Sequence, residues 1–223
     1  MPYKAIRKNP SAPQVAAHIL AALQDIPVAA LSDNLHRNIG SVGLQPYHRP
    51  GHKTMAGTAV TVKTRGGDNL TPMRAFEFCR PGDVLVIDAG GDVTNAVIGG
   101  ILSFYTATIG TAGLVLDGAI RDVAEIRERD YPVYARGVNH RGPYKDGPGE
   151  INVPVSVGGM VVNPGDIVVG DQDGLLAFSP DEAELLIEKA RAHLETEART
   201  IQAMKEGRWD RSFLDALEAR CMN

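Results

Sequence analysis

The fold class can be predicted from residues 82–126, GDVLVIDAGGDVTNAVIGGILSFYTATIGTAGLVLDGAIRDVAEI. Within RPGDVLVIDAGG, residues 80–91, a turn leads into an apolar run that ends in glycines, which is typical of a buried strand. We expect a buried helix over 94–110, a second buried strand over 112–118, and an amphipathic helix over 119–130 with Val123 and Ile126 facing inward. This mixture of strands and helices predicts an α/β protein.

The middle of this stretch could be mistaken for a membrane span. No charged residue occurs between Val93 and Leu116, a length that could cross a bilayer. Glycines and polar residues interrupt it, however, and IGTAG at 109–113 is typical of a helix end followed by a strand. We therefore expect a buried helix and strand, and no membrane partner.

The flanking sequence predicts helices at both ends of the chain. Residues 13–26, 28–40 and 68–79 have helical patterns, and 57–65, 131–137 and short runs over 153–178 have strand patterns. A long helix over 179–207 begins with Ser179 as N-cap and Pro180 at its first position, before an amphipathic tail at 210–221. Because no linker divides the chain, we expect one domain over 1–223 with a mixed sheet, not a doubly wound Rossmann sheet.

The composition and charge of the chain limit the kinds of molecule that we expect it to bind. The chain has 223 residues, a formal net charge of −4 and no basic block, which argues against nucleic-acid binding. Its two cysteines have no metal-ligand spacing, and its start lacks an apolar secretory region. We therefore expect a cytoplasmic protein.

The segment DGAIRD, residues 117–122, has the residues for an anion and metal site. We expect a glycine turn between a strand and a helix, where backbone N–H groups favour anions. Arg121 suits a carboxylate, and Asp122 suits Mg²⁺ or Mn²⁺. A 2-oxo acid could use both, through its carboxylate and its keto oxygen. The alternative is a capped helix start with two exposed charges.

The whole stretch at 82–126 resembles the central motif of the RraA-like family, above all in the G-x-x-x-D-G-x-x-R-D spacing from Gly113 to Asp122. That family includes regulators of ribonuclease activity and class II 4-hydroxy-4-methyl-2-oxoglutarate/4-carboxy-4-hydroxy-2-oxoadipate aldolases. The resemblance runs from about Ala29 to Gly207. It implies a single-domain β/β/α "swivelling" fold, homotrimers or homohexamers with sites between subunits, and divalent-metal cleavage of 4-hydroxy-2-oxo acids with oxaloacetate decarboxylation as a side activity.

The resemblance also implies roles for individual residues. Asp122 resembles the metal ligand and Arg121 the substrate-binding arginine, and Lys145 resembles a pocket lysine, although an exposed loop lysine is the alternative. Glu197 lies on an apolar helical stripe where the family places a catalytic glutamate from a neighbouring subunit; the alternative is that it sits on the rim of the stripe and reaches water. The loop that holds the substrate carboxylate through backbone amides corresponds to Gly99, Gly100, Ile101 and Leu102.

One position departs from the family pattern. Where the aldolases and the regulators have an acidic residue, this chain has Gly100. In the aldolases that acid helps to hold metal-bound water, and the loss of such support is costly. Asp92 or Asp117 could substitute for it. A separate pair, His48 and His52, has a helical metal spacing, but Pro50 and Gly51 favour a loop there.

Three functions are compatible with these residues. The first is a metal-dependent carbon–carbon lyase that releases pyruvate from a 4-hydroxy-2-oxo diacid, with Arg121, Lys145 and Glu197 as catalytic residues. The second is a non-catalytic oligomeric binding protein similar to the ribonuclease regulators, which Gly100 favours. A related lyase with a different substrate is the third possibility.

Overall fold

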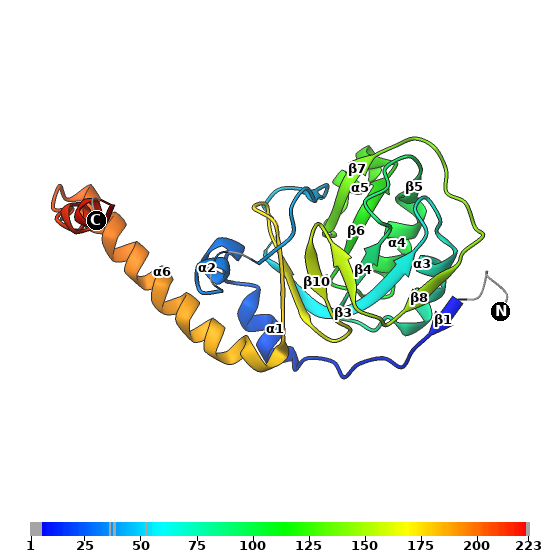
Figure 1. The fold of residues 1–223 in the computed structure, drawn as a ribbon, viewed down its shortest axis with the longest axis horizontal. Coiled ribbons are helices and arrows are strands. Elements are labelled where there is room, and N and C mark those ends of the chain that lie inside the picture. Colours follow the sequence, from blue (N-terminus) through cyan, green and yellow to red (C-terminus); the bar gives the residue numbers. More distant parts are fainter. Residues whose placement is uncertain (1–5, 36, 38, 52, 222–223) are drawn as a thin grey trace.

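The computed structural model describes residues 6–35, 37, 39–51 and 53–221, and a mixed sheet forms its centre (Figure 1). Parallel strands make up the middle of the sheet, in the order β3 (Met55–Thr64), β4 (Asp83–Asp88), β6 (Gly113–Ile120) and β7 (Val133–Val138). Antiparallel partners flank them: β8 (Gly149–Ile151) and β11 (Ile167–Gly170) on β3, and β2 (Gln45–Pro46) on β7. Beyond these, β1 (Ile6–Lys8), β5 (Ala96–Ile98) and β12 (Leu175–Phe178) pair with β8, β6 and β11. The predicted mixed α/β class is confirmed.

The central strands are mostly apolar because both faces of the sheet are covered. Along β4, Leu85 and Ile87 pack against one cluster, and Val84 and Val86 pack against another. The first cluster includes residues of α3 (Leu70–Ala75), α4 (Gly100–Thr108) and α5 (Val123–Glu128); the second includes the hairpin of β9 (Val155–Val157) and β10 (Met160–Val162). Val123 and Ile126 pack inward from α5, as predicted.

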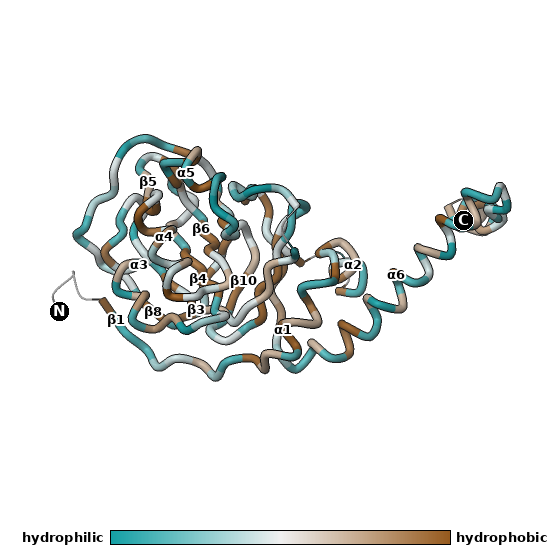
Figure 2. The backbone as a smooth tube through the Cα atoms, turned by 180° about the vertical axis from the view of Figure 1, so that it is seen from behind, coloured by the Kyte–Doolittle hydropathy of each residue, from teal (hydrophilic) through white to brown (hydrophobic). Residues whose placement is uncertain are grey.

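The terminal helices form a third packed group. α1 (Ala17–Leu23), α2 (Val28–Asp33) and the first half of α6 (Ala183–Lys205) pack with β11 and β12. The rest of α6 projects from the body and leads to α7 (Phe213–Cys221) (Figure 1). Hydrophobic residues continue along the projecting part (Figure 2), where Ile201 and Met204 are exposed. Among the described residues, no helix is long and apolar enough to cross a membrane.

The single buried helix expected over 94–110 is wrong. Its first residues form the strand β5, and the helix α4 begins only at Gly100. α4 is not buried either: Ile101 is 81% exposed, and Phe104 and Tyr105 also face outward. A three-residue apolar run cannot be told from a buried helix turn by periodicity, and pairing with β6 decides the outcome.

The glycine turn expected inside DGAIRD is also wrong. β6 continues through Gly118 to Ile120 because β5 pairs with its last residues. A Cβ on Gly118 would lie 3.1 Å from Cβ of Ala89, so the glycine there permits close packing.

Two smaller boundaries differ from the prediction. The helix over 68–79 is α3 followed by a 3-10 turn at Phe76–Phe78. Ser179 caps a 3-10 turn at Pro180–Glu182, through a hydrogen bond from the Asp181 amide, and α6 starts after it. Of the pair His48 and His52, the second lies outside the described residues.

Candidate active site

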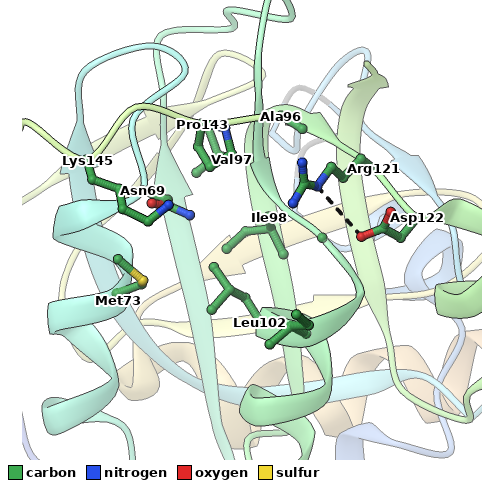
Figure 3. A pocket seen from close by; sticks show the side chains of 12 residues that line it. Asn69, Met73, Ala96, Val97, Ile98, Leu102, Arg121, Asp122, Pro143 and Lys145 are labelled. Carbon is green, nitrogen blue, oxygen red and sulfur yellow. Dashed lines mark ion pairs between the residues drawn. The ribbon is translucent and has the colours of Figure 1, made fainter. Parts of the chain in front are cut away.

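A cavity of about 250 Å³ lies at the edge of the sheet where the parallel strands end (Figure 3). Each polar wall residue comes from a segment that follows a strand: Asn69 after β3, Arg121 and Asp122 after β6, and Lys145 after β7. The carboxyl ends of parallel strands are the usual location of ligand sites in α/β sheets. The remaining walls are largely apolar and comprise Met73, Ala96, Val97, Ile98, Gly99, Ile101, Leu102 and Pro143.

Arg121 and Asp122 are held by the junction of β5 and α4. The Arg121 amide donates to the Ile98 carbonyl (3.0 Å), and the Asp122 Oδ2 accepts from the Gly100 amide (2.9 Å). Asp122 adopts a left-handed conformation with φ of 60°, which Asp tolerates better than most residues. A Cβ on Gly99 would lie 2.6 Å from Asp122 Oδ2, so only glycine allows this approach. Arg121 Nε lies 3.7 Å from Asp122 Oδ2.

Lys145 lines the cavity because a buried carboxylate holds its loop. Asp68 is fully buried and accepts hydrogen bonds from the amides of Asp146 (2.7 Å) and Gly147 (3.0 Å). The backbone of Tyr144 also pairs with Gly67 and Asn69. These bonds dock the loop beside α3, so Lys145 is a wall residue of the cavity, although the segment is long and polar.

Not every backbone amide of the predicted carboxylate-binding loop, residues 99–102, is available to a substrate. The Gly100 amide is taken by Asp122. The amides of Ile101 and Leu102 lie in the first turn of α4, where the helix offers no carbonyl partner. Both residues line the cavity.

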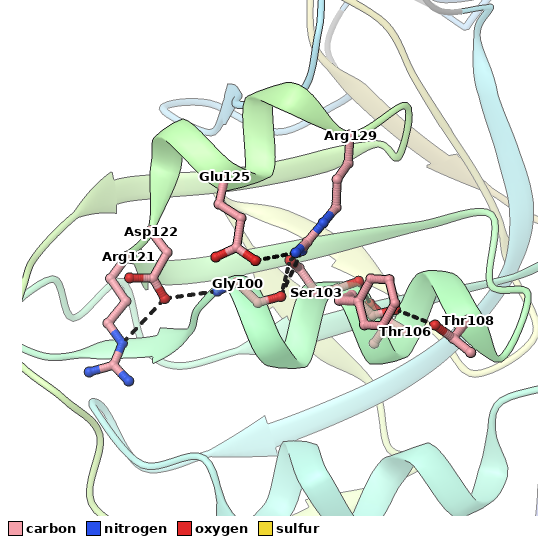
Figure 4. A network of polar contacts seen from close by, with 9 residues as sticks. Gly100, Ser103, Thr106, Thr108, Arg121, Asp122, Glu125 and Arg129 are labelled. Atoms are coloured by element: carbon pink, nitrogen blue, oxygen red, sulfur yellow. Dashed lines mark hydrogen bonds and ion pairs between the residues drawn. The ribbon is translucent and has the colours of Figure 1, made fainter.

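The space beside Gly100 is filled by a side chain that the sequence did not single out. A Cβ at residue 100 would overlap the Glu125 carboxylate, which extends from α5 (Figure 4). Arg129 pairs with Glu125 and also donates to the Gly100 carbonyl (2.7 Å) and to Ser103 Oγ (3.2 Å). A carboxylate is therefore present beside Gly100, contributed by the next helix.

Asp92 and Asp117, which were expected to replace the missing acid at residue 100, form hydrogen bonds elsewhere. Asp117 is buried, pairs with Arg136 and accepts from the Gly158 amide (2.7 Å). Asp92 accepts from the amide (2.7 Å) and hydroxyl (2.6 Å) of Thr94, and these bonds lower the pKa of Asp92. Neither Asp92 nor Asp117 lines the cavity.

Glu197 does not reach this cavity within its own chain. It lies in the second half of α6, where its Oε1 lies 3.2 Å from His193 Nε2. Its carboxylate is about half exposed. The same His193 nitrogen lies 3.5 Å from Asp33 Oδ2, which ties α6 to the end of α2. Glu197 could join Arg121 and Asp122 only if α6 came from another copy.

Asn69 is a cavity residue that sequence reasoning missed. An asparagine before a helix is ordinarily read as an N-cap, and Asn69 does precede α3, but its side chain makes no capping bond. The local sequence carries no signal that its amide lines a cavity.

The donor set fits a hard divalent cation only in part. Asp122 offers one carboxylate, and Mg²⁺ is often held by one or two carboxylates, with water and substrate completing its shell. Within the described ranges, no three His, Cys, Asp or Glu side chains gather as a metal cage. Such a cation would therefore depend on the substrate and on a second carboxylate.

Comparisons with known proteins agree with this architecture. Residues 28–177 match the RraA-like family, described as Aldolase/RraA. A Halalkalibacterium halodurans protein, provisionally named a 4-hydroxy-4-methyl-2-oxoglutarate aldolase, is 37% identical over 180 residues, or 80% of this chain and 84% of that protein.

Two solved structures also resemble this chain. An uncharacterized Pseudomonas syringae protein has a TM-score of 0.78 at 27% identity, over 89% of this chain and 93% of its own. Streptomyces coelicolor RraAS2, described as an unusual member of the RNase ES inhibitor RraA family, has a TM-score of 0.75 at 27% identity, over 84% and 97%. The chain belongs to the RraA-like family.

Proposed function

We propose that this protein is a divalent-metal-dependent carbon–carbon lyase that cleaves a 4-hydroxy-2-oxo diacid to pyruvate and decarboxylates oxaloacetate as a side reaction. The observation that carries the proposal is the placement of Arg121 and Asp122 in one largely apolar cavity beside the first turn of α4. Family membership and the name of the Halalkalibacterium relative support the same class of reaction.

Asp122 is the residue that would hold Mg²⁺ or Mn²⁺. The bound cation would supply a Lewis acid that draws electron density from the 2-keto oxygen. The Asp122 Oδ2 already accepts from the Gly100 amide, which fixes the orientation of the carboxylate.

The other residues of the cavity orient the substrate. Arg121 suits the carboxylate of the 2-oxo acid, since a guanidinium binds a carboxylate through two parallel hydrogen bonds. The amides of Ile101 and Leu102 provide further donors at the helix start. The apolar side chains of Ile98 and Leu102 reduce contact with water, which strengthens these interactions.

Cleavage requires a base and an acid. A base takes the proton of the 4-hydroxyl, the C3–C4 bond breaks, C4 becomes a carbonyl carbon, and the electron pair forms the enolate of pyruvate. A proton then returns to C3. We assign this proton transfer to Glu197 of a neighbouring copy, and we assign Lys145 to the developing negative charge.

This assignment requires a homo-oligomer, as a trimer or a hexamer. Two exposed apolar surfaces support it: Ile101, Phe104 and Tyr105 on α4 beside the cavity, and Ile201 and Met204 on the projecting half of α6. Large apolar side chains gathered at a surface are typical of interfaces. Contact with another copy would also bring a second Glu197 toward the cavity.

The first prediction concerns metal removal. Pyruvate release from oxaloacetate and from 4-hydroxy-4-methyl-2-oxoglutarate should fall to the enzyme-free rate with excess EDTA, and should return above the metal-only background when Mg²⁺ or Mn²⁺ is added in excess of EDTA. Coupling to lactate dehydrogenase measures the rate. Equal turnover with and without EDTA would contradict the metal requirement.

The second prediction concerns Glu125, whose carboxylate we assign to support of the cation in place of the missing acid at residue 100. Glu125→Gln should weaken Mn²⁺ binding by about tenfold, measured by calorimetry, because outer-shell partners typically contribute that much. Glu128→Gln, on the same helix, is the matched control and should bind Mn²⁺ as the wild type does.

A relocated carboxylate tests the same assignment. The three atoms nearest to a Cβ at residue 100 all belong to the end of the Glu125 side chain. Gly100→Asp combined with Glu125→Ala, which empties that space, should bind Mn²⁺ more tightly than Glu125→Ala alone. If the double variant binds no better than Glu125→Ala, a carboxylate beside residue 100 does not support the cation.

A regulatory binding protein is the second candidate function. Gly100 and the similarity to RraAS2 favour it. Folded, oligomeric protein that releases no pyruvate with either metal would support this function and contradict the lyase.

A further inference from the structure

Asp68 is a fully buried carboxylate in the connection that follows β3. It does not line the cavity, although the next residue, Asn69, does. Its Oδ1 accepts from the Leu70 amide (3.0 Å), and its Oδ2 accepts from the amides of Asp146 (2.7 Å) and Gly147 (3.0 Å). Burial of a carboxylate is unfavourable unless hydrogen bonds compensate for it. The buried carboxylate and the loop that contains Lys145 therefore depend on each other.

The backbone is held on both sides of Lys145. Before it, the Tyr144 amide donates to the Gly67 carbonyl (2.8 Å), and the Tyr144 carbonyl accepts from the Asn69 amide (3.0 Å). After it, Asp68 accepts from the next two backbone amides. Figure 3 shows the Lys145 side chain beside Asn69 at the cavity wall. Because both neighbours of Lys145 are fixed, these bonds determine where its side chain starts.

Arg65 contacts the same part of the loop. Its Nη2 lies 3.3 Å from Asp68 Oδ2 and 3.6 Å from Asp146 Oδ2. Its guanidinium also lies 5.4 Å from the centre of the Tyr144 ring. The Arg65 side chain is about half exposed, so it pairs with the buried carboxylate while it stays in contact with water. Arg65 therefore adds a contact on each side of Lys145.

We propose that Asp68 is a positioning residue of the lyase reaction, which directs the Lys145 ammonium group toward the negative charge that develops in the cavity. The inference rests on the proposed function for the role of Lys145. Asp68 acts only through the backbone that flanks Lys145, with Arg65 as its charged partner. Stabilisation of developing charge requires donors that are already in place, so a displaced ammonium group contributes much less.

Asp83 is a matched control for Asp68. It is also fully buried, and it also pairs with an arginine three residues earlier, since Arg80 donates to it from its amide (2.8 Å) and its Nε (3.2 Å). Asp83 begins β4, however, whereas the cavity lies where the strands end, and Asp83 does not line it. Asp68→Asn and Asp83→Asn should lower the thermal midpoint by similar amounts. A difference between their activities therefore reports on the cavity.

The first test is a double-mutant cycle with Lys145. With Mg²⁺, Asp68→Asn should lower kcat/KM for 4-hydroxy-4-methyl-2-oxoglutarate about tenfold, and it should cause no further loss in Lys145→Ala, where the positioned group is absent. Asp83→Asn should leave kcat/KM unchanged in both backgrounds. Equal losses from Asp68→Asn in both backgrounds, or no loss in either, would overturn the proposal.

Arg65→Met keeps the test possible if Asp68→Asn does not fold. It leaves the buried carboxylate and its backbone bonds in place and removes only the half-exposed guanidinium. We expect a smaller loss of kcat/KM that again disappears in Lys145→Ala. The same loss in both backgrounds would contradict an action through Lys145.

Oxalate binding separates this proposal from the lyase assignment. Oxalate is planar and dianionic, as is the enolate of pyruvate, and its binding requires no turnover. Titration calorimetry with Mg²⁺ should show that Asp68→Asn weakens oxalate binding about tenfold when Lys145 is present and not in Lys145→Ala. If the wild type releases no pyruvate but shows this pattern, the lyase assignment fails and the positioning role stands. If Asp68→Asn or Lys145→Ala binds oxalate as the wild type does, the positioning role fails.

Discussion

Asp122→Ala is expected to reduce metal-dependent pyruvate release by about 10²–10³-fold, the usual consequence of losing one group that stabilises developing charge. Asp122 is the only carboxylate among the described residues that line the cavity. Its loss would remove that carboxylate from the cavity wall and leave the Gly100 amide without the oxygen to which it donates. Initial rates with saturating Mn²⁺ measure the effect.

The matched control for this substitution is Glu128→Ala. Glu128 is an exposed carboxylate on α5, the helix that Asp122 precedes. The control should retain the wild-type rate and thermal midpoint. Asp122→Ala should remain folded but lose about 1–2 kcal/mol of stability, because alanine is unfavourable at φ of 60° and cannot accept from the Gly100 amide. Undiminished turnover in folded Asp122→Ala would show that the Arg-Asp pair is not the reacting centre, and attention should then move to protein partners.

Asp117→Asn is expected to lower the free energy of unfolding by about 2 kcal/mol, because the buried carboxylate loses its charge-assisted hydrogen bond with the partly exposed Arg136. Asp117 pairs with Arg136, and their hydrogen bond raises the pKa of that guanidinium. The same carboxylate accepts from the Gly158 amide in the turn between β9 and β10, so it ties that hairpin to the sheet. Urea unfolding measures the change.

The neighbouring strand supplies the control for Asp117. Asp88 of β4 lies directly beside Asp117 of β6 in the sheet register, but it is half-buried and accepts from the backbone of Gly90 and Ser156. Asp88→Asn should cost about 1 kcal/mol, as expected for hydrogen bonds near water. Equal costs for the two substitutions would contradict the structural role of the Asp117–Arg136 pair.

The sequence predicts the fold best where an apolar pattern has clear flanking signals. The apolar residues at 84–87 lie between a turn and two glycines and belong to the strand β4, as predicted. The spacing of Val123 and Ile126 places them on one helical face. The pattern fails at 96–98, where a short apolar run fits a strand or a helix, and at Gly118, where the glycine relieves packing against Ala89.

The residues of the candidate site also differ in how well the local sequence predicts them. Arg121, Asp122 and the loop at 99–102 are adjacent in sequence to the pattern that reveals them. Lys145 reaches the cavity only because Asp68, far away in the sequence, binds its loop. Glu125 reads as an ordinary exposed helix charge, and Asn69 as an ordinary cap. Their surroundings depend on tertiary contacts that no local sequence pattern encodes.

The placement of the polar wall residues after the strands has a consequence for evolution. The interior of the sheet consists of β3, β4, β6 and β7, whereas Asn69, Arg121 and Lys145 lie in the connections beyond them. Substitutions in these connections leave the packed interior intact. During evolution, substitutions in these connections can therefore change the substrate preference with little effect on stability, so no compensating substitutions in the core are required.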